Sequence, residues 1–476
     1  MSSAFSANLR LNLLLIYSLL CVVFVSGTVY GWPALRAALL AEGVLAARCQ
    51  SQDRGVNEHM AGKRCREQDI ALGAVFAAGS WTVQGGRFFF GIMRDACGTR
   101  TTVAVSGMLA AVGAVVLATA AENDLASFAV AFALVGLGSG SQLALQPVAA
   151  LFPRKRSTVT GFLSAAFQVS GGVFTVITWP ASGYESSNTR LISFTTYSAA
   201  VVVFVAIGWV VLPRGPSYAE LLPSSKQEPP LPAKGVDDDN AATDDPPAVA
   251  VVEAAAPLYP LEHLGLREQL LSVEYLLLSG WFALVFTCCQ YHVISIGDQL
   301  EEMRVSDANR LSRLYTVVYA CVFPLAPMAG RLADSVGYGP VTVGLTTSVA
   351  VAFAFLHSSS DVVQLVGFVL MSGGRLMLFA IYFAHMNSIF GFRFYGALAG
   401  GGLLASSLVA LVQYPLLSWG LTSGFAGPNA LGAGVSAVSA LYGVYVCVRE
   451  SKKRKFSYEV SIKSERDPPG WSMTAS

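Results

Sequence analysis

The 476-residue chain is 54% hydrophobic and only 13% charged, with a formal net charge of +1. This composition excludes an ordinary soluble globule, in which about 25% of residues are charged. A chain that crosses the lipid bilayer many times fits it far better.

Twelve apolar windows of about 20 residues, the length that crosses roughly 30 Å of hydrocarbon, follow one another along the chain. They lie at residues 11–35, 70–93, 102–121, 126–152, 159–179, 192–212, 273–296, 314–333, 341–355, 362–389, 395–417 and 429–448. The first is longer than the apolar region of a secretory signal and eleven others follow, so we expect a retained helix. The predicted fold class is an all-α integral membrane protein with twelve transmembrane helices.

A long polar stretch divides these windows into six and six. Residues 213–268 are rich in proline and acidic residues, for example "KQEPPLPAK" and "VDDDN", a composition that cannot bury a core and predicts a disordered cytoplasmic linker. Residues 1–212 are then an N-terminal six-helix bundle, residues 269–448 a C-terminal six-helix bundle, and residues 449–476 a basic cytoplasmic tail. Short loops rich in Lys and Arg favour a cytoplasmic location for both termini.

The two halves share a loop pattern. The first copy, after the second window, has Gly91, Asp95, Gly98 and Arg100, and the second copy, after the eighth window, has Gly330, Asp334 and Gly337. Glycines permit a tight turn and close helix approach, while Asp95 can accept hydrogen bonds from a helix N-terminus and pair with Arg94 or Arg100. Matching places in both halves predict an internal repeat.

The pattern G-x-x-x-D-x-x-G-x-R resembles the signature loop of the major facilitator superfamily. The resemblance implies the major facilitator fold, two six-helix bundles that rock against each other, and a role for the loop as a latch on one conformation. The second copy has Gly339 where the final arginine would stand, so we expect it to hold less tightly.

An arginine interrupts the tenth window. Arg375 lies within "LMSGGRLMLFA", near the middle of an apolar run over residues 362–383. An unpaired charge at the bilayer centre costs at least ~2.5–3.5 kcal/mol, so Arg375 is predicted to face a watery cavity between the bundles. Its guanidinium fork suits a substrate carboxylate; the alternative is a bridge to backbone carbonyls or polar side chains of the seventh or eleventh helix. Arg87, nearer the cytoplasmic end of its window, is expected to extend to the headgroups.

Further polar and aromatic side chains lie at mid-depth and are candidates for substrate binding. They are Tyr30, Gln142, Gln168, Gln290, Tyr291 and Gln413. Each either lines the cavity or forms a hydrogen bond to another helix. Glycines near the helix centres, including Gly27, Gly31 and Gly138, either expose backbone carbonyls to a substrate or allow close helix packing.

The centres of the windows contain no Asp or Glu, which favours uniport over proton-coupled symport. His292 and His385, toward helix ends, titrate in the physiological range if the cavity reaches them. We find no phosphate-binding loop and no nucleophile with a His and acid partner. Enzymatic activity, a cofactor, a metal, a nucleic-acid partner and an obligate protein partner are therefore not expected, whereas a small-molecule substrate and membrane lipids are.

Two cysteines, Cys49 and Cys65, are the pair in the first predicted outer loop. A disulfide between them would close a loop of about 15 residues and contribute up to about 3 kcal/mol. We therefore predict this disulfide on the extracytoplasmic face.

Several stretches are similar to solute carrier family 43. They are "GWPALRAALLAEG" (31–43), "CREQD" (65–69), "GSWTVQGGRFFFGIMRDACGTR" (79–100), "FVLMSGGR" (368–375) and "ALVQYPL" (410–416). The resemblance implies sodium-independent facilitation of large neutral amino acids or of a purine nucleobase, at the plasma membrane. This chain has Cys288 and Cys289 where that family tends to be more basic, which leaves substrate identity open. A nutrient receptor that binds the same ligand without transporting it is a further alternative.

Overall fold

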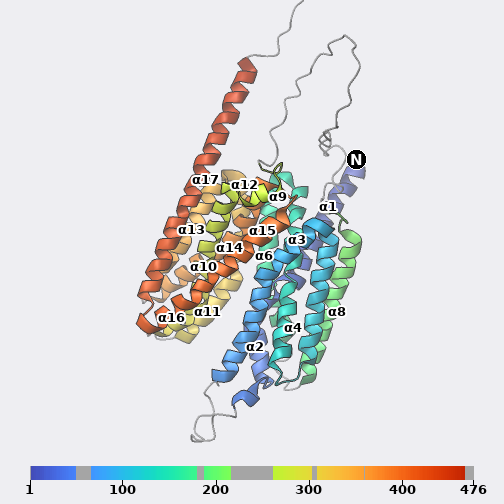
Figure 1. Ribbon diagram of the computed structural model, residues 1–476, viewed down its shortest axis with the longest axis vertical. Coiled ribbons are helices and arrows are strands. Elements are labelled where there is room, and N and C mark those ends of the chain that lie inside the picture. Colours follow the sequence, from blue (N-terminus) through green and yellow to red (C-terminus); the bar gives the residue numbers. More distant parts are fainter. Residues whose placement is uncertain are drawn as a thin grey trace, which may run out of the picture.

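The computed structural model describes residues 2–49, 66–178, 187–215, 261–302, 308–358 and 360–466, and all regular elements in these ranges are helical. Ten of the described helices are long and apolar enough to cross a membrane. They fall into two groups, with α1 to α8 in one and α10 to α17 in the other (Figure 1). The all-α fold class predicted above is confirmed.

The elements of the N-terminal bundle are as follows. They are α1 (Ser2–Cys21), η1 (Val22–Ser26), η2 (Thr28–Gly31), α2 (Trp32–Ala41), η3 (Ala46–Cys49), α3 (Arg66–Thr119), α4 (Leu125–Leu137), α5 (Gly140–Leu145), η4 (Gln146–Leu151), η5 (Pro153–Lys155), α6 (Arg156–Val169), α7 (Gly172–Thr178) and α8 (Ser187–Val211). The C-terminal bundle has α9 (Leu266–Leu270), α10 (Val273–Glu302), α11 (Ala308–Cys321), α12 (Leu325–Val336), α13 (Tyr338–Phe355), α14 (Asp361–Phe390), α15 (Tyr395–Val409), η9 (Ala410–Val412), α16 (Gln413–Ser423) and α17 (Ala426–Arg466).

Two local features reconcile ten long helices with twelve predicted crossings. The helix α3 joins the second and third windows, and it turns back at Gly98, whose φ of +85° lies in the left-handed region that favours glycine. The eighth window is split into α11 and α12 before Pro324, which has no N–H to continue the hydrogen-bond ladder. Counting α3 as two crossings and adding the split helix gives the predicted twelve.

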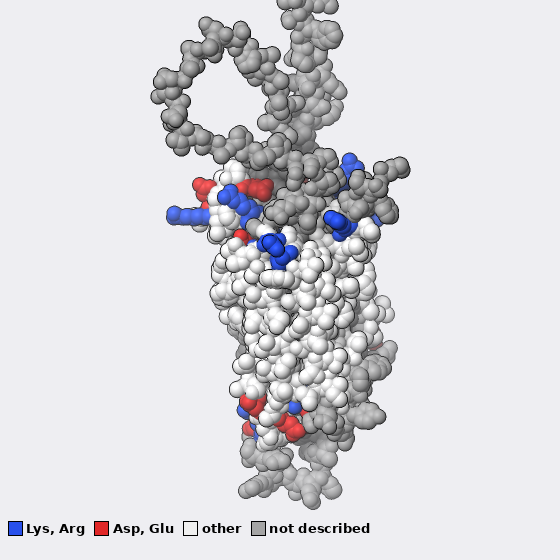
Figure 2. Space-filling view, turned by 90° about the vertical axis from the view of Figure 1, so that its right-hand side faces the viewer, with Lys and Arg blue, Asp and Glu red and all other residues white. Residues whose placement is uncertain are grey.

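Each bundle has its own core of large aromatic side chains. Phe128, Phe132 and Phe174 lie in the N-terminal core, and Phe282 and Phe353 lie in the C-terminal core. On the face shown in Figure 2, charged side chains gather toward the two ends and a wide belt between them shows none. A belt without charged side chains matches the hydrocarbon layer of a membrane. In that layer, van der Waals packing and hydrogen bonds hold the helices together, and not the exclusion of water.

The glycines near the helix centres serve close packing. A Cβ on Gly31 would collide with the backbone carbonyl of Gly171, and one on Gly138 with the carbonyl of Val25. The helices of the N-terminal bundle therefore approach each other at these points to backbone contact. Of the two alternatives for these glycines, the contacts support helix packing.

The bundles meet at one end of the molecule. There α3 contacts α15, and α6 contacts both α12 and α14. We call this end, which carries Asp95 and Asp334, the latch end, and the opposite end the far end. The N-terminus and the last turns of α17 both lie at the latch end (Figure 1).

The far end of the N-terminal bundle is tied by an ion pair. Arg190 at the start of α8 lies 3.0 Å from Glu42 after α2, and its guanidinium also donates to the carbonyls of Leu117 and Ala120 at the end of α3. Burial raises the pKa of Glu42, while the Arg190 guanidinium acts in the opposite direction. The pair holds three helix ends together.

The predicted linker and tail overlap described helices at their edges. Residues 216–260 of the linker lie outside the described residues, but α9 begins within its predicted range, and the Leu261 amide donates to the Ile389 carbonyl at 3.1 Å. The helix α17 continues past the predicted boundary at residue 448 to Arg466. The tail therefore begins as a continuation of the last membrane helix.

Candidate functional site

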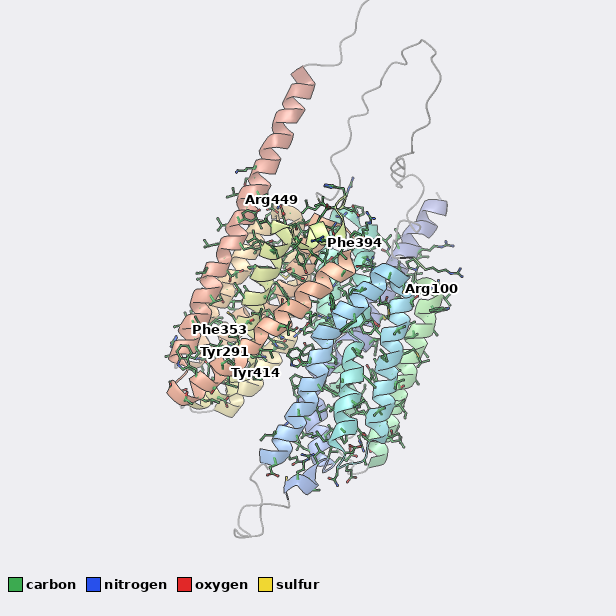
Figure 3. The ribbon with its side chains drawn as sticks, viewed as in Figure 1. Arg100, Tyr291, Phe353, Phe394, Tyr414 and Arg449 are labelled. Atoms are coloured by element: carbon green, nitrogen blue, oxygen red, sulfur yellow. The ribbon has the colours of Figure 1, made fainter. Side chains whose placement is uncertain are left out.

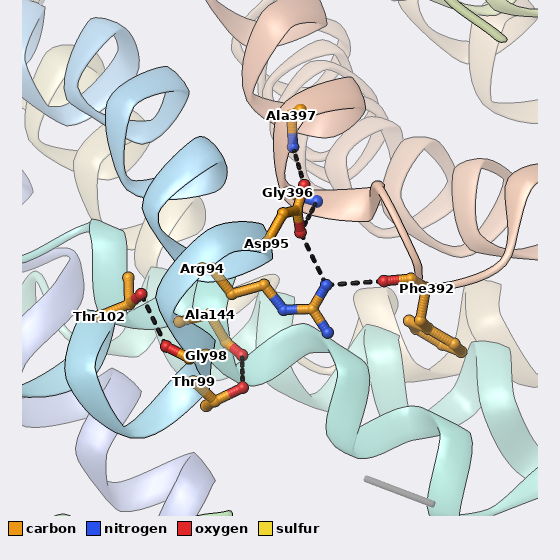
Figure 4. A network of polar contacts seen from close by, with 9 residues as sticks. All are labelled: Arg94, Asp95, Gly98, Thr99, Thr102, Ala144, Phe392, Gly396 and Ala397. Atoms are coloured by element: carbon orange, nitrogen blue, oxygen red, sulfur yellow. Dashed lines mark hydrogen bonds and ion pairs between the residues drawn. The ribbon is translucent and has the colours of Figure 1, made fainter. Parts of the chain in front are cut away.

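The first repeated loop ties the N-terminal bundle to the start of α15. The Asp95 carboxylate accepts hydrogen bonds from the amides of Gly396 at 3.1 Å and Ala397 at 2.7 Å (Figure 4). Arg94 pairs with Asp95 at 2.9 Å and also donates to the Phe392 carbonyl at 2.7 Å. A carboxylate at a helix N-terminus is favoured by both the free amides and the helix dipole. This cluster joins the two bundles.

Close backbone approach makes this contact possible. A Cβ on Gly91 would collide with the Gly396 carbonyl, so any larger residue would push α3 and α15 apart. Of the two arginines that Asp95 was expected to pair with, Arg94 is the one in contact. Arg100 stays within its own bundle, where its guanidinium donates to the Leu212 carbonyl at 2.8 and 3.1 Å.

The second repeated loop makes the equivalent contact with α6. Asp334 accepts hydrogen bonds from the Ser157 amide at 3.1 Å, the Thr158 amide at 2.9 Å and the Thr158 hydroxyl at 2.7 Å. Gly330 lies against the Ser157 carbonyl, and Gly337 turns the chain with a φ of +103°. Asp334 thus accepts three hydrogen bonds from the other bundle, whereas Asp95 accepts two and its neighbour Arg94 donates a third to the Phe392 carbonyl. These contacts do not support the expectation of a weaker second latch.

A second layer of contacts lies next to Asp334. The hydroxyls of Ser157 and Tyr338 are 2.6 Å apart, and the Asn387 side chain donates to the Thr160 hydroxyl at 3.4 Å. The His385 ring stacks on Tyr338 at 4.6 Å between ring centroids. With both repeated loops engaged, the latch end is closed.

A small central cavity lies between the bundles at mid-depth. Its volume is about 20 Å³, room for about one water molecule. Its lining residues are Tyr30, Phe167 and Gln168 from the N-terminal bundle and Tyr319, Ser372, Arg375, Leu376 and Phe379 from the C-terminal bundle. Three of the predicted substrate-binding residues, Tyr30, Gln168 and Arg375, therefore come together here.

Arg375 is held within this cavity by neutral partners. Its side chain donates from Nη2 to the Gln290 Oε1 at 2.6 Å, and its guanidinium lies 5.3 Å from the centroid of the Tyr319 ring. The residue is 7% exposed, and its Nε has no hydrogen-bond partner among the described residues. The guanidinium is thus buried without a carboxylate of the described residues in contact, and its partner Gln290 on α10, the seventh window, is the polar bridge given above as the alternative to substrate binding.

A larger cavity, which we call the far cavity, opens between the bundles in the half toward the far end. It has a volume of about 180 Å³. Its walls include Phe76, Trp81, Gln84, Phe286, Gln290, Ile294, Gln413 and Tyr414. Gln290 lines the far cavity while its amide oxygen holds Arg375, so this residue connects the two cavities. Gln413, also predicted, lies on the far-cavity wall.

Arg87 is not where its sequence position suggested. Its side chain is fully buried, donates from Nη2 to Gln142 Oε1 at 2.5 Å, and places its guanidinium 4.4 Å from the Phe167 ring centroid. The prediction that Arg87 extends to the headgroups is wrong, because α5, which carries Gln142, and α6, which carries Phe167, cover its side chain. Gln142 is accordingly a partner of Arg87 and lines neither cavity.

A polar chain runs from Arg87 to the central cavity. Arg87 donates to Gln84 Oε1 at 3.4 Å, and Gln84 in turn donates to the Tyr30 hydroxyl at 3.4 Å. The sequence analysis did not predict Gln84 as a site residue, although a side-chain amide in the middle of an apolar window indicates such a role. It also missed Phe167 and Tyr319, which aromatic composition alone does not distinguish from core residues.

Tyr291, one of the predicted substrate-binding residues, packs inside the C-terminal bundle instead. It is buried against Phe353, with ring centroids 6.4 Å apart, as Figure 3 shows. It follows Gln290 in α10, and successive residues of a helix point about 100° apart. The helix therefore directs Gln290 to the cavities and Tyr291 to the core.

The structure describes only one of the two cysteines in the predicted disulfide. Cys49 is disulfide-bonded in the structure, but Cys65, its expected partner, lies outside the described residues. The pairing stays a prediction.

The sequence model of the Major Facilitator Superfamily matches residues 67–413 of the chain. Among curated relatives, a Staphylococcus aureus protein provisionally named as a proline/betaine transporter is 44% identical over 72 residues. That match covers 14% of this chain and 16% of the relative, so the chain spans about a sixth of that relative's length.

Solved structures share the fold at low sequence identity. The human organic anion transporter MFSD10 has a TM-score of 0.59 and 14% identity, with 90% of this chain and 99% of that chain covered. The proton:xylose symporter XylE bound to 6-bromo-6-deoxy-D-glucose has a TM-score of 0.56 and 14% identity, with coverages of 90% and 94%. The family match extends over well more than half of the chain and the fold agrees with it, so this protein belongs to the Major Facilitator Superfamily.

Proposed function

We propose that this membrane transporter is a facilitative, sodium-independent uniporter of neutral amino acids that works by alternating access between its two bundles. The observation that carries the proposal is Arg375, a desolvated cation held by Gln290 at 2.6 Å in a cavity between the bundles. We also propose that the latch end is cytoplasmic, as its basic loops favour, and that the protein resides in the plasma membrane.

The guanidinium of Arg375 suits the α-carboxylate of an amino acid. Its planar fork binds a carboxylate through two parallel hydrogen bonds, and the Gln290 amide oxygen now occupies one of the donors. A substrate carboxylate would displace Gln290 and supply the negative charge that the cavity lacks. Gln290 in this interpretation is a neutral placeholder for the substrate.

The rest of the central cavity suits an apolar side chain and a few polar contacts. Phe167, Tyr319 and Phe379 provide aromatic walls, while the Gln168 side chain and the Tyr30 hydroxyl offer oxygen acceptors for an ammonium group. The cavity now holds about 20 Å³, which is too small for an amino acid. Substrate therefore enters through the far cavity and separates these walls as it binds.

The conformation corresponds to one half of a transport cycle. The latch end is closed by the contacts of Asp95 and Asp334, and the far cavity gives access from the other side. On the proposed orientation this state admits substrate from outside the cell. Release of substrate into the cell requires the hydrogen bonds from both helix N-termini to the Asp95 and Asp334 carboxylates to break as the bundles rock.

The described residues that line the two cavities include no Asp, Glu or His. His292 is fully buried against Tyr315 and Phe353, and His385 lies at the latch end in contact with Tyr338. A proton-coupled mechanism needs a titratable group that reaches the substrate pathway. This arrangement supports uniport over proton symport.

A second candidate substrate class is favoured by the pair of buried arginines. The Arg87 guanidinium lies over the Phe167 ring, and Arg375 lines the central cavity together with Phe167. Among the described residues, each arginine donates to side-chain amide oxygen and neither contacts a carboxylate. Two uncompensated cations attract a carboxylate and repel an ammonium group. Carboxylates without an amino group, such as 2-oxo acids, are therefore the alternative.

The test is an uptake panel with purified protein in liposomes, without any sodium or proton gradient. The substrates are labelled leucine, its 2-oxo acid, leucinamide and hypoxanthine, and the variants are Arg375→Gln and Arg393→Gln. Leucinamide lacks the carboxylate and the 2-oxo acid lacks the ammonium, so each arm removes one recognised group. Arg393 is an exposed arginine at the latch end, which makes it a matched control.

We expect saturable uptake of leucine, none of leucinamide, and a loss of about 10- to 100-fold in kcat/KM for Arg375→Gln, the effect of one charge-assisted interaction. Arg393→Gln should transport normally. Uptake of the 2-oxo acid alone would favour the second candidate, and hypoxanthine alone the nucleobase alternative, with Arg375 donating to a ring carbonyl. Flux that needs an imposed proton gradient would contradict uniport, and binding without flux would point to a receptor.

A further inference from the structure

A third cavity lies apart from the transport pathway, at the latch end of the N-terminal bundle. It has a volume of about 710 Å³ and lies between α1 and residues 151–155, which run from the end of η4 through η5. Its lining residues are Leu11, Asn12, Leu151, Phe152, Pro153, Arg154 and Lys155. Most of this lining is apolar, and the two cations follow one another at one edge.

The cations at this edge are exposed and uncompensated. Arg154 and Lys155 both have exposed side chains in the short helix η5. Neither forms an ion pair with an acidic residue of the described chain ranges. An apolar cavity with a basic rim is complementary to a molecule that combines a hydrocarbon chain with an anionic head.

The cavity also opens where lipid lies. Leu9, Leu13 and Ile16 are half exposed on α1, at 50%, 54% and 52%, which is the exposure of a lipid-facing stripe. Asn12 is exposed and lies three residues after Leu9 and four before Ile16, so it shares that side of the helix. Arg10 is exposed next to Leu9, where the apolar span of α1 begins, and so marks the level of the headgroups.

We infer that this cavity binds an anionic phospholipid of the leaflet at the latch end. Arg154 and Lys155 hold the headgroup phosphate, and Asn12 is placed to donate a further hydrogen bond. An acyl chain lies along Leu11, Leu151 and Phe152. A soluble phosphate would leave this apolar surface uncovered, which is why the inference names a lipid.

The position of the cavity links the lipid to the latch. Lys155 is followed by Arg156, Ser157 and Thr158, and the amides of the last two are the ones that Asp334 holds. A headgroup bound to Lys155 restrains the first turn of α6 at the same place.

The experiment is a lipid-binding measurement on the purified full-length protein, independent of transport. Native mass spectrometry counts phosphatidylglycerol and phosphatidylcholine retained by the wild type, by Arg154→Gln/Lys155→Gln, and by the control Arg393→Gln/Lys452→Gln. The control removes two other exposed cations from the same end. Glycerol 3-phosphate, which carries the anionic group without acyl chains, is added as a competitor.

We expect the wild type to retain phosphatidylglycerol in preference to phosphatidylcholine, and Arg154→Gln/Lys155→Gln to lose affinity for it by about thirtyfold, the factor for two headgroup contacts. The control variant should bind as the wild type does. Equal binding by the Arg154→Gln/Lys155→Gln variant, or an equal loss in the control variant, would overturn the site. Full competition by glycerol 3-phosphate would show a phosphate site and not a lipid site.

Discussion

At the scale of single residues, Gln290 is the point where the two cavities of the proposed transport pathway meet. Its side chain lines the far cavity, and its amide oxygen accepts the 2.6 Å hydrogen bond from Arg375. A residue that occupies the proposed carboxylate site before the substrate arrives must be displaced for binding. Its affinity for Arg375 therefore sets part of the cost of substrate binding.

This role predicts different effects on KM for two substitutions of Gln290. Gln290→Glu places a permanent carboxylate on Arg375 and should raise KM at least about tenfold, or about 1.4 kcal/mol. Gln290→Leu removes the competitor and should leave KM unchanged or lower it. Concentration-dependent uptake in liposomes measures both.

The Arg375→Gln background provides the control for this pair. Without the guanidinium no ion pair can form, so Gln290→Glu should have little further effect there, and the two changes should be non-additive. An unchanged KM in Gln290→Glu alone would contradict the placeholder role.

At the scale of secondary-structure elements, two helix N-termini close the latch end. Asp95 accepts the amides of Gly396 and Ala397 at the start of α15, and Asp334 accepts those of Ser157 and Thr158 at the start of α6. Each carboxylate belongs to one bundle and each helix start to the other. The two contacts are therefore broken together when the bundles separate at this end.

Asn substitution at either position should weaken the closed latch end to a similar extent. An amide keeps the shape but replaces charged acceptors, at a cost of roughly 1.5–3 kcal/mol for a hydrogen bond to a charged group, which shifts the conformational ratio by about tenfold or more. Distances between spin labels placed across the latch end measure this ratio. Asp361→Asn, at an exposed helix start outside the interface, should not change it.

A strong effect of Asp95→Asn with none of Asp334→Asn would restore the original expectation of a weaker second latch. That expectation rested on the arginine missing at position 339. In the structure, Arg100 of the first copy binds the Leu212 carbonyl of its own bundle and takes no part in the cross-bundle contact. The absence of its counterpart therefore removes nothing from the interface.

At the scale of the whole molecule, one end of the bundle interface is closed and the other has a cavity. Ala77 lines the far cavity, whereas Thr160 is fully buried at the closed end. In a chain whose exposed native Cys97 and Cys321 are replaced, Ala77→Cys should react with a membrane-impermeant thiol reagent and Thr160→Cys should not. Mass spectrometry of the labelled protein measures both reactions.

Alternating access further predicts that this pattern reverses. Adding Asp95→Asn should decrease labelling of Ala77→Cys and allow labelling of Thr160→Cys when the reagent has access to both sides. Equal reactivity of the two positions in the parent protein would mean that the bundles do not close at the latch end as described.

The sequence by itself determined the membrane class, the twelve crossings, the repeated loops and the presence of Arg375 in the membrane. Hydrophobic length is a local property, because each crossing must satisfy its own backbone and match the bilayer thickness. The same locality makes a charge within an apolar run stand out. These features need no knowledge of neighbouring helices.

Only the tertiary structure decided what those features contact. Arg87 and Arg375 are both arginines within apolar windows, yet Arg87 lies beneath Gln142 and Phe167 whereas Arg375 reaches a cavity. Gln290 and Tyr291 are adjacent in sequence, yet they point to a cavity and to a core. The depth of a side chain follows from its position along one helix, but its partners follow from how the other helices pack around it, and a single helix sequence does not contain that information.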